Sequence, residues 1–244
     1  MSLSHLERVT ILWGSPSSLL LDHLLIPIGT KLTQWVGTFD RVVEDHLPRS
    51  LDNLRNISNI TDIQFRIGKH YTRMKLRGPS GKLYTGSQVD TTCSGLESLA
   101  GLDTSKIERL EVVSSDHPFR RPSYHVLLPL ENLRTLTLYR CRNPCAFLAA
   151  LHPGAGVMTC PKLEEIILVS LKGTETIDIE RVIKIAAARQ SRGAKLKIVR
   201  IVGLQAKIHP LDVLELEKRV LHVEYHPEVD VVDDHSDDGD EGFR

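Results

Sequence analysis

The chain has 244 residues, of which 41% are hydrophobic and only 5% aromatic, and its 31 Lys and Arg balance 31 Asp and Glu. This composition requires an aliphatic core and gives the whole chain no charge bias toward nucleic acid or an anionic membrane. No apolar run reaches the roughly 18 residues of a membrane span, and residues 1–10 lack the apolar region of a secretory signal. We therefore expect a cytoplasmic or nuclear protein.

A recurring apolar pattern predicts short strands along the chain. Its clearest copy is Leu133-x-x-Leu136-x-Leu138-x-x-Cys141, the leucine-rich repeat signature. Weaker copies begin at Leu6, Ile60, Ile107, Leu163 and Leu196. One such unit cannot bury its apolar side alone. We therefore predict an α/β fold, a leucine-rich-repeat-like solenoid in which parallel strands have helices behind them.

Helical spacing alternates with these strands. It predicts helices at 17–26, 47–57, 95–102, 144–151, 178–191 and 211–219, and further strands at 31–36 and 220–225. The clearest helix is 178–191, which Asp178 can cap at its start and Gly193 can end in the left-handed conformation.

Residues 60–90 break the repeat rhythm. Strands are predicted at 62–67, 71–77 and 82–86, with Gly-rich turns between them. We interpret them as an irregular β-meander inserted in one solenoid that spans residues 1–226, and a division into two lobes stays open as an alternative. Residues 227–244 are rich in Asp and Glu and are expected to form a disordered acidic tail.

The cysteine, histidine and glycine motifs do not have the spacing of chemical sites. Cys141, Cys145 and Cys160 lack the paired Cys-x-x-Cys arrangement of zinc sites and are interpreted as packed thiols. His222 and His226 lie in a strand-like alternation rather than on a helix. We predict no catalytic residues, no metal site and no cofactor, and we expect the protein not to be an enzyme.

The segments 78–82 and 189–200 each resemble a binding motif only in part. The first ends like a phosphate loop but lacks the Walker A spacing, so a hairpin turn is preferred. The second contains the basic residues Arg189, Arg192, Lys195, Lys197 and Arg200. Without interleaved aromatic residues, these charges are assigned to a helix end and strand edges rather than to nucleic-acid binding.

The outward side chains of the strands are the predicted binding surface for a protein target. The candidate residues are Arg134, Thr135, Thr137, Tyr139, Glu164, Glu165, Lys197 and Arg200. If adjacent repeats are in register, Arg134, Glu165 and Arg200 are expected to line up. Neither nucleic acid nor a membrane is an expected partner.

Residues 130–204 carry a family resemblance in four stretches. They are LENLRTLTLYRC (130–141), FLAALHP (147–153), CPKLEEI (160–166) and AAARQSRGAKL (186–196). This run resembles the C-terminal leucine-rich-repeat-like region of F-box proteins from mushroom-forming fungi. The resemblance implies a substrate receptor of a ubiquitin ligase, in which an F-box docks an adaptor and the repeats hold the substrate.

The F-box itself is expected to be absent, because Leu47-Pro48-Arg49-Ser50-Leu51 matches only its opening. An adaptor contact is then expected only if an F-box is supplied elsewhere. The predicted function is a non-enzymatic protein-binding module, with the substrate-binding part of such a ligase receptor as the implied role. Two alternatives stay open, namely a truncated or degenerate family member without selected function and an enzyme whose site has no recognisable motif.

Overall fold

The computed structural model describes residues 7–12, 24–28, 30–36, 54–57, 59–67, 72–79, 81–88, 102–114, 127–139, 145–152, 157–170, 178–203 and 208–226. The predicted acidic tail at 227–244 lies outside these residues. So do most of the predicted helices at 17–26, 47–57 and 95–102.

Strands make up most of the described structure. They are β1 (Arg8–Leu12), β2 (Lys31–Val36), β3 (Asp62–Ile67), β4 (Thr72–Gly78), β5 (Gly81–Gln88), β6 (Arg109–Ser114), β7 (Thr135–Tyr139), β8 (Glu165–Val169), β9 (Ile198–Val202) and β10 (His222–His226). The described helices are α3 (Cys145–Leu151), α4 (Ile179–Ser191) and α5 (Pro210–Glu217), with short 3₁₀ turns η2 (Arg55–Ile57) and η4 (Thr104–Lys106).

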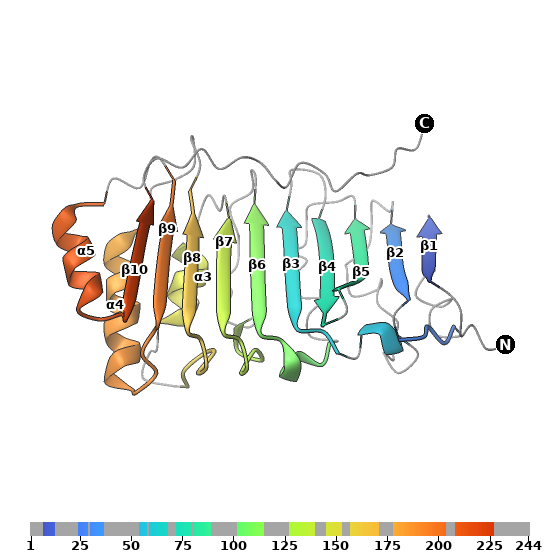
Figure 1. Ribbon diagram of the computed structural model, residues 1–244, viewed down its shortest axis with the longest axis horizontal. Coiled ribbons are helices and arrows are strands. Elements are labelled where there is room, and N and C mark those ends of the chain that lie inside the picture. The colour runs from blue at the N-terminus through green and yellow to red at the C-terminus, as the bar shows by residue number, and fades with distance from the viewer. Residues whose placement is uncertain are drawn as a thin grey trace.

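All the described strands join one open sheet with the order β1-β2-β5-β4-β3-β6-β7-β8-β9-β10 (Figure 1). Every pairing is parallel except the two made by β4. The parallel pairing expected for the segments that begin at residues 107, 133, 163 and 196 is therefore confirmed. The fold is mixed α/β with a mostly parallel sheet.

The apolar positions of the predicted pattern form straight rows across the sheet. One row is Leu110, Leu136, Ile166 and Val199, and the next is Val112, Leu138, Leu168 and Ile201. Each of these side chains is at most 2% exposed. Full burial of an aliphatic side chain contributes about 1.5–3 kcal/mol. The rows thus form a continuous part of the buried core on this side of the sheet.

The predicted meander is present, with β3, β4 and β5 as antiparallel neighbours. The three strands lie in the sheet in the reverse of their chain order. The first of them, β3, pairs with β6, and the last, β5, pairs with β2. Two successive reversals leave β5 parallel to β3, so the parallel sheet continues on both sides. Gly78 lies opposite Gly81 across a tight hairpin turn, as predicted.

The helices cover one face of the sheet. In Figure 1, α3 and α4 lie behind the C-terminal strands, and α5 lies beside β10. Phe147, Val182 and Leu216 from these helices belong to the same buried cluster as Leu136. We call this the inner face and the opposite one the outer face. Among the described helices, none has the length and apolar character needed to cross a bilayer.

The helix predicted at 178–191 is confirmed as α4. The Asp178 carboxylate accepts a hydrogen bond from the Arg181 backbone N–H at 3.0 Å and caps the start. Gly193 has φ of 76°, the left-handed conformation expected after the helix end. The helices predicted at 144–151 and 211–219 correspond to α3 and α5, which begin at Cys145 and Pro210.

The helix predicted at 47–57 is wrong in its described part. Leu54 forms a parallel bridge with Ile26, which was expected to end a helix, and residues 55–57 form the 3₁₀ turn η2. Leu54, Ile57 and Ile60 are all buried. A 3₁₀ turn has three residues per turn, so residues three apart face the same way. The helix was predicted from Leu51 and Leu54, and a spacing of three fits an α-helix as well as a 3₁₀ turn.

Candidate protein-binding site

The predicted binding residues fall into two groups. Thr135, Thr137 and Tyr139 alternate with buried Leu136 and Leu138 on β7, which places them on the outer face. Glu165 and Arg200 lie on the same outer face of β8 and β9. The other candidates precede the strands and lie at the sheet margin where the parallel strands begin. We call this the strand-start margin.

A chain of polar contacts crosses the outer face from β7 to β10. Thr135 Oγ1 donates to Glu165 Oε2 at 3.2 Å, and Arg200 Nη1 lies 3.7 Å from Glu165 Oε1. Arg200 Nε also donates to Glu224 Oε2. That hydrogen bond lowers the pKa of Glu224 and raises the pKa of Arg200. The contacts fix side chains of four strands while leaving them partly exposed.

The strand-start margin carries a second charge row. Glu164 Oε1 lies 2.8 Å from Lys197 Nζ and 3.9 Å from Arg134 Nη1. The hydrogen bond from Lys197 lowers the pKa of Glu164. Two cations thus share one carboxylate. The expected alignment of Arg134, Glu165 and Arg200 is met only by Glu165 and Arg200, because Arg134 pairs with Glu164 instead.

The outer face becomes apolar toward the strand ends. Val113, Tyr139 and Val169 lie opposite one another and form a cluster separate from the main core. Tyr139 is only 5% exposed. Strand alternation predicts the side of the sheet on which Tyr139 lies correctly. Its ring is nevertheless buried in the cluster and does not offer an open contact surface.

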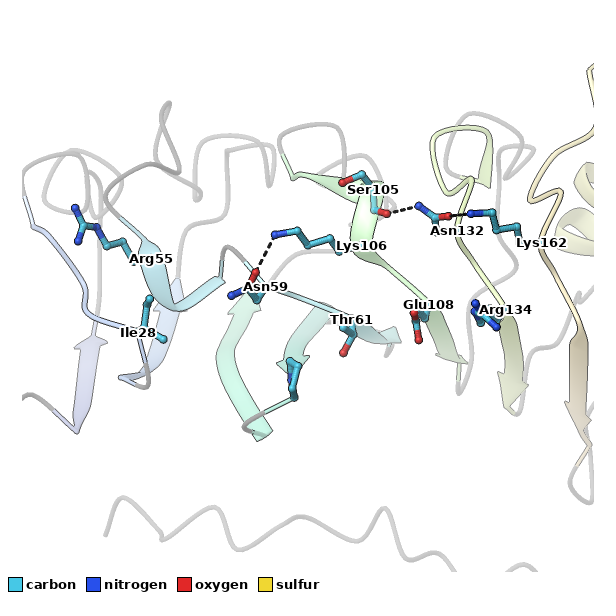
Figure 2. Close-up of a pocket in the computed structure, with 11 residues that line it drawn as sticks. Ile28, Arg55, Asn59, Thr61, Ser105, Lys106, Glu108, Asn132, Arg134 and Lys162 are labelled. Atoms are coloured by element: carbon cyan, nitrogen blue, oxygen red, sulfur yellow. Dashed lines mark hydrogen bonds between the residues drawn. The ribbon is translucent and has the colours of Figure 1, made fainter.

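A hollow of about 620 Å³ opens at the strand-start margin. Figure 2 shows its lining, which consists of Ile28, Arg55, Asn59, Thr61, Pro79, Ser105, Lys106, Glu108, Asn132, Arg134 and Lys162. Arg134 is the only predicted site residue among these lining residues. Four of them are cationic and one, Glu108, is acidic. Among the described lining residues, cationic side chains therefore outnumber acidic ones.

Side chains from successive turns are linked along the hollow (Figure 2). Lys106 Nζ donates to Asn59 Oδ1 at 2.8 Å, and Lys162 Nζ donates to Asn132 Oδ1 at 2.5 Å. Asn132 Nδ2 in turn donates to the Ser105 carbonyl oxygen. We call Asn59, Lys106, Asn132 and Lys162 the Asn/Lys ladder.

A sequence signal for this ladder exists but was missed. Each of its residues stands immediately before the first apolar residue of a repeat copy, Ile60, Ile107, Leu133 or Leu163. Stacking the copies in register therefore brings these positions together. The first outward residues predicted in these copies, Arg134 and Glu164, lie two positions after Asn132 and Lys162, so the ladder was not among the predicted residues.

The described cysteine and histidine residues do not gather into a metal site. Within the described parts of the chain, no three His, Cys, Asp or Glu side chains come together as ligands would. Cys160 is fully buried, its Sγ donates to the Leu127 carbonyl oxygen at 3.3 Å, and burial raises the pKa of the thiol to about 12. It is a packed thiol. Cys141 lies outside the described residues.

His222 and His226 share one face of β10 with Glu224, which confirms the strand reading of this motif. Their Nε2 atoms lie 3.5 Å and 4.0 Å from the Glu224 carboxylate. The same carboxylate accepts the hydrogen bond from Arg200. Glu224 thus serves the polar chain of the outer face.

Arg189 does not belong to an exposed basic stretch, contrary to the sequence-based assignment. It is 0% exposed, and its guanidinium donates to the carbonyl oxygens of Thr159 at 3.1 Å and Cys160 at 2.8 Å. Burial lowers its pKa, yet arginine remains protonated near neutral pH. Arg189 therefore ties α4 to the turn that precedes β8.

No family model matches this chain, and searches of curated proteins and of solved structures each found no match. Its function is accordingly inferred from the fold and from the geometry of the outer face and the strand-start margin.

Proposed function

We propose that this chain is a leucine-rich-repeat-like solenoid that binds another protein through the outer face of its sheet and catalyses no reaction. Support for the solenoid comes from the register of β6 to β9, in which equivalent positions of successive repeat copies lie side by side. Repeat arrays of this kind use an extended strand surface for binding.

One observation carries the binding proposal. All three described helices, α3, α4 and α5, add buried side chains to the inner-face core, and none of them lies over the outer face. Thr135, Thr137, Glu165 and Arg200 are partly exposed there. The contacts of Thr135, Glu165 and Arg200 hold these three side chains in place before a partner arrives, which lowers the entropic cost of association.

A photo-crosslinking residue on each face tests the proposal. We expect the full chain with the crosslinker at Thr137 to form one discrete protein adduct, because Thr137 lies on the outer face of β7 with β6 and β8 on either side. The control carries it at Lys184, which is exposed on α4. Adding Thr135→Arg should abolish the Thr137 adduct by blocking the adjacent surface. Equal adducts at both positions, or none at Thr137, contradict the proposal.

The resemblance of residues 130–204 to F-box proteins supports a narrower proposal, that the bound protein is a substrate of a ubiquitin ligase. Co-elution of the purified chain with a cullin-ligase adaptor in size-exclusion chromatography tests it. Co-elution supports the receptor role and contradicts the expectation that the F-box is absent. Separate elution, together with no ubiquitination of the crosslinked partner when a separate F-box subunit is added, rejects the receptor role.

A further inference from the structure

We propose that the protein bound by the outer face places an aromatic side chain on the guanidinium of Arg200 and on the apolar side chains beside it. The inference rests on the proposed protein-binding function and names the chemistry that the partner presents. We call Ile167, Ile198, Arg200 and Val202 the Arg200 patch.

Arg200 is flanked by apolar side chains on the outer face. Ile167 of β8 lies directly beside it, and Ile198 and Val202 lie two residues before and after it on β9. All four residues of the patch are partly exposed. Ile167 and Val202 also pack against the separate apolar cluster of the outer face. The patch therefore holds aliphatic surface that a bound partner removes from water.

Two of the three nitrogens of the Arg200 guanidinium already face carboxylates. Nε donates to Glu224 on β10, and Nη1 lies 3.7 Å from Glu165 on β8. These contacts hold the planar group from both neighbouring strands, and they balance its charge. The Arg200 side chain is still 35% exposed. A ligand that leaves both carboxylates in place is therefore expected to meet the face of the guanidinium.

An aromatic ring matches both parts of the patch. The negative face of a ring attracts a cation within about 6 Å of the ring centre, and its carbon atoms pack on aliphatic side chains. Adjacent strands lie about 4.8 Å apart, and residues two apart in a strand lie about 6.6 Å apart. One ring can therefore contact Arg200, Ile167 and Val202 together.

A charged ligand side chain matches the patch less well. A carboxylate would lie near Glu165 and Glu224, and an ammonium group would lie against the guanidinium of Arg200. Each would meet a like charge at short range. The electrostatic complement of this compensated guanidinium is thus the face of a neutral ring.

Methyl and arginine side-chain NMR of the full chain tests the proposal. The probe is the blocked tripeptide Gly-Trp-Gly, and the comparison peptides have Leu or Lys in place of Trp. We expect only the Trp peptide to move the methyl resonances of Ile167 and Val202 upfield, because the ring current shields atoms above its face. The Nε–H resonance of Arg200 should shift over the same titration.

Two variants separate the cation from the apolar surface. Ile167→Thr combined with Arg200→Gln should weaken binding of the Trp peptide about tenfold, because an apolar contact and the cation are both lost. Arg200→Lys keeps a cation between the two carboxylates but removes the planar group, so it should weaken binding about threefold.

The matched control is Leu214→Thr combined with Arg219→Gln on the helical side of the molecule. Leu214 is exposed on α5, and Arg219 donates to the Glu215 carboxylate as Arg200 does to Glu224. This control should bind like the wild type, with circular dichroism showing that all variants are folded.

Several outcomes overturn the proposal. They are no upfield shift in the wild type, equal binding of the three peptides, an equal loss in both double variants and unchanged affinity in Arg200→Lys. Preference for the Lys peptide also overturns it, because Glu165 and Glu224 are then the groups that recognise the ligand.

These failures are distinguishable from failure of the proposed function. A Thr137 adduct without the upfield shifts keeps the outer face as a protein-binding surface and rejects only the aromatic contact. Loss of the Thr137 adduct rejects the function on which the inference rests.

Discussion

The two halves of the sheet form the same rows of apolar residues on the inner face, but their strands are connected differently. From β6 to β10 the strands follow chain order, all pair in parallel, and α3, α4 and α5 accompany them. From β1 to β5 the strand order is rearranged around the antiparallel β4, and the helical structure described there is the short turn η2. Yet Ile63 and Phe65 continue the rows of Leu110 and Val112. The sheet therefore requires aligned apolar positions and tolerates different connections between them.

The two halves of the sheet are also stabilised by different kinds of contact. Helix α4 is tied to the neighbouring turn by the buried Arg189, and its start and end have defined caps. The meander is held by pairing on both sides of β4, which includes the buried pairs Ile63 with Leu76 and Phe65 with Met74. The C-terminal half should therefore depend most on single packing residues.

The largest expected effect comes from placing a charge in the inner rows of that half. Leu138→Asp buries a carboxylate without a partner and should destabilise the chain by about 5 kcal/mol, enough to unfold the C-terminal half. Thermal melting followed by circular dichroism measures it. Thr137→Asp, on the outer face of the same strand, is the control and should change stability little. An unchanged melt for Leu138→Asp contradicts the register.

Arg189→Met should cost about 4 kcal/mol, because it leaves buried carbonyl oxygens of the 159–163 turn without donors. Denaturant unfolding provides the measurement. The neighbouring Arg192 is exposed, so Arg192→Met should shift the free energy of unfolding by no more than about 0.5 kcal/mol. Similar losses in the two variants would mean that α4 is not anchored by a buried guanidinium.

Substitutions at two glycines of the C-terminal half distinguish steric crowding from backbone strain as causes of destabilisation. A Cβ at Gly203 would lie 1.7 Å from the Ser170 carbonyl oxygen, whereas a Cβ at Gly193 would meet no atom within 4 Å. Both have positive φ. Gly203→Ala should therefore destabilise by about 3 kcal/mol and Gly193→Ala by about 1 kcal/mol. Melting temperatures that fall equally would argue against the close approach of Gly203, the residue after β9, to Ser170, the residue after β8.

The smallest expected effect is a pH dependence confined to the polar chain of the outer face. The pKa of Glu224 is lowered in the folded state by the hydrogen bond from Arg200. The contribution of the Glu224 carboxylate to the free energy of unfolding is therefore complete above the ordinary glutamate pKa of about 4.3. It is lost as the pH falls through the lower pKa that Glu224 has in the folded state. Glu224→Gln should be less stable than the wild type near neutral pH, and the difference should shrink in acid. A difference that is constant from pH 7 to pH 3 would exclude the ion pair as its cause.

Much of the strand pattern could be predicted because alternation is a local property. The strands at 31–36 and 62–67 match β2 and β3 in full. The helix at 178–191 was also predictable, since its apolar stripe, its N-cap Asp178 and its terminal Gly193 all agree. Residues 54–57 were assigned wrongly because apolar residues three apart fit both a 3₁₀ turn and an α-helix over so short a segment.

The candidate site was predictable only in part. Thr135, Glu165 and Arg200 on the outer face follow from strand alternation and do form a chain of contacts. The hollow and the Asn/Lys ladder bring together side chains that are far apart in the sequence, from Asn59 to Lys162. Which of these residues become neighbours depends on which repeat copies stack and in what register. Arg189 was assigned to the surface because its charge outweighed its place on the apolar side of α4.

The sequence by itself determined the short strands and which of their side chains face the core, because both depend on residues close together in the chain. The repetition of strand and helix along the sequence predicted the parallel direction. Only the tertiary structure decided the reversed order of β5, β4 and β3, the burial of Arg189 and the hollow at the strand-start margin. These features arise where separate segments meet. Local spacing sets which side of a strand a residue faces, whereas only the stacked sheet sets which residues become its neighbours.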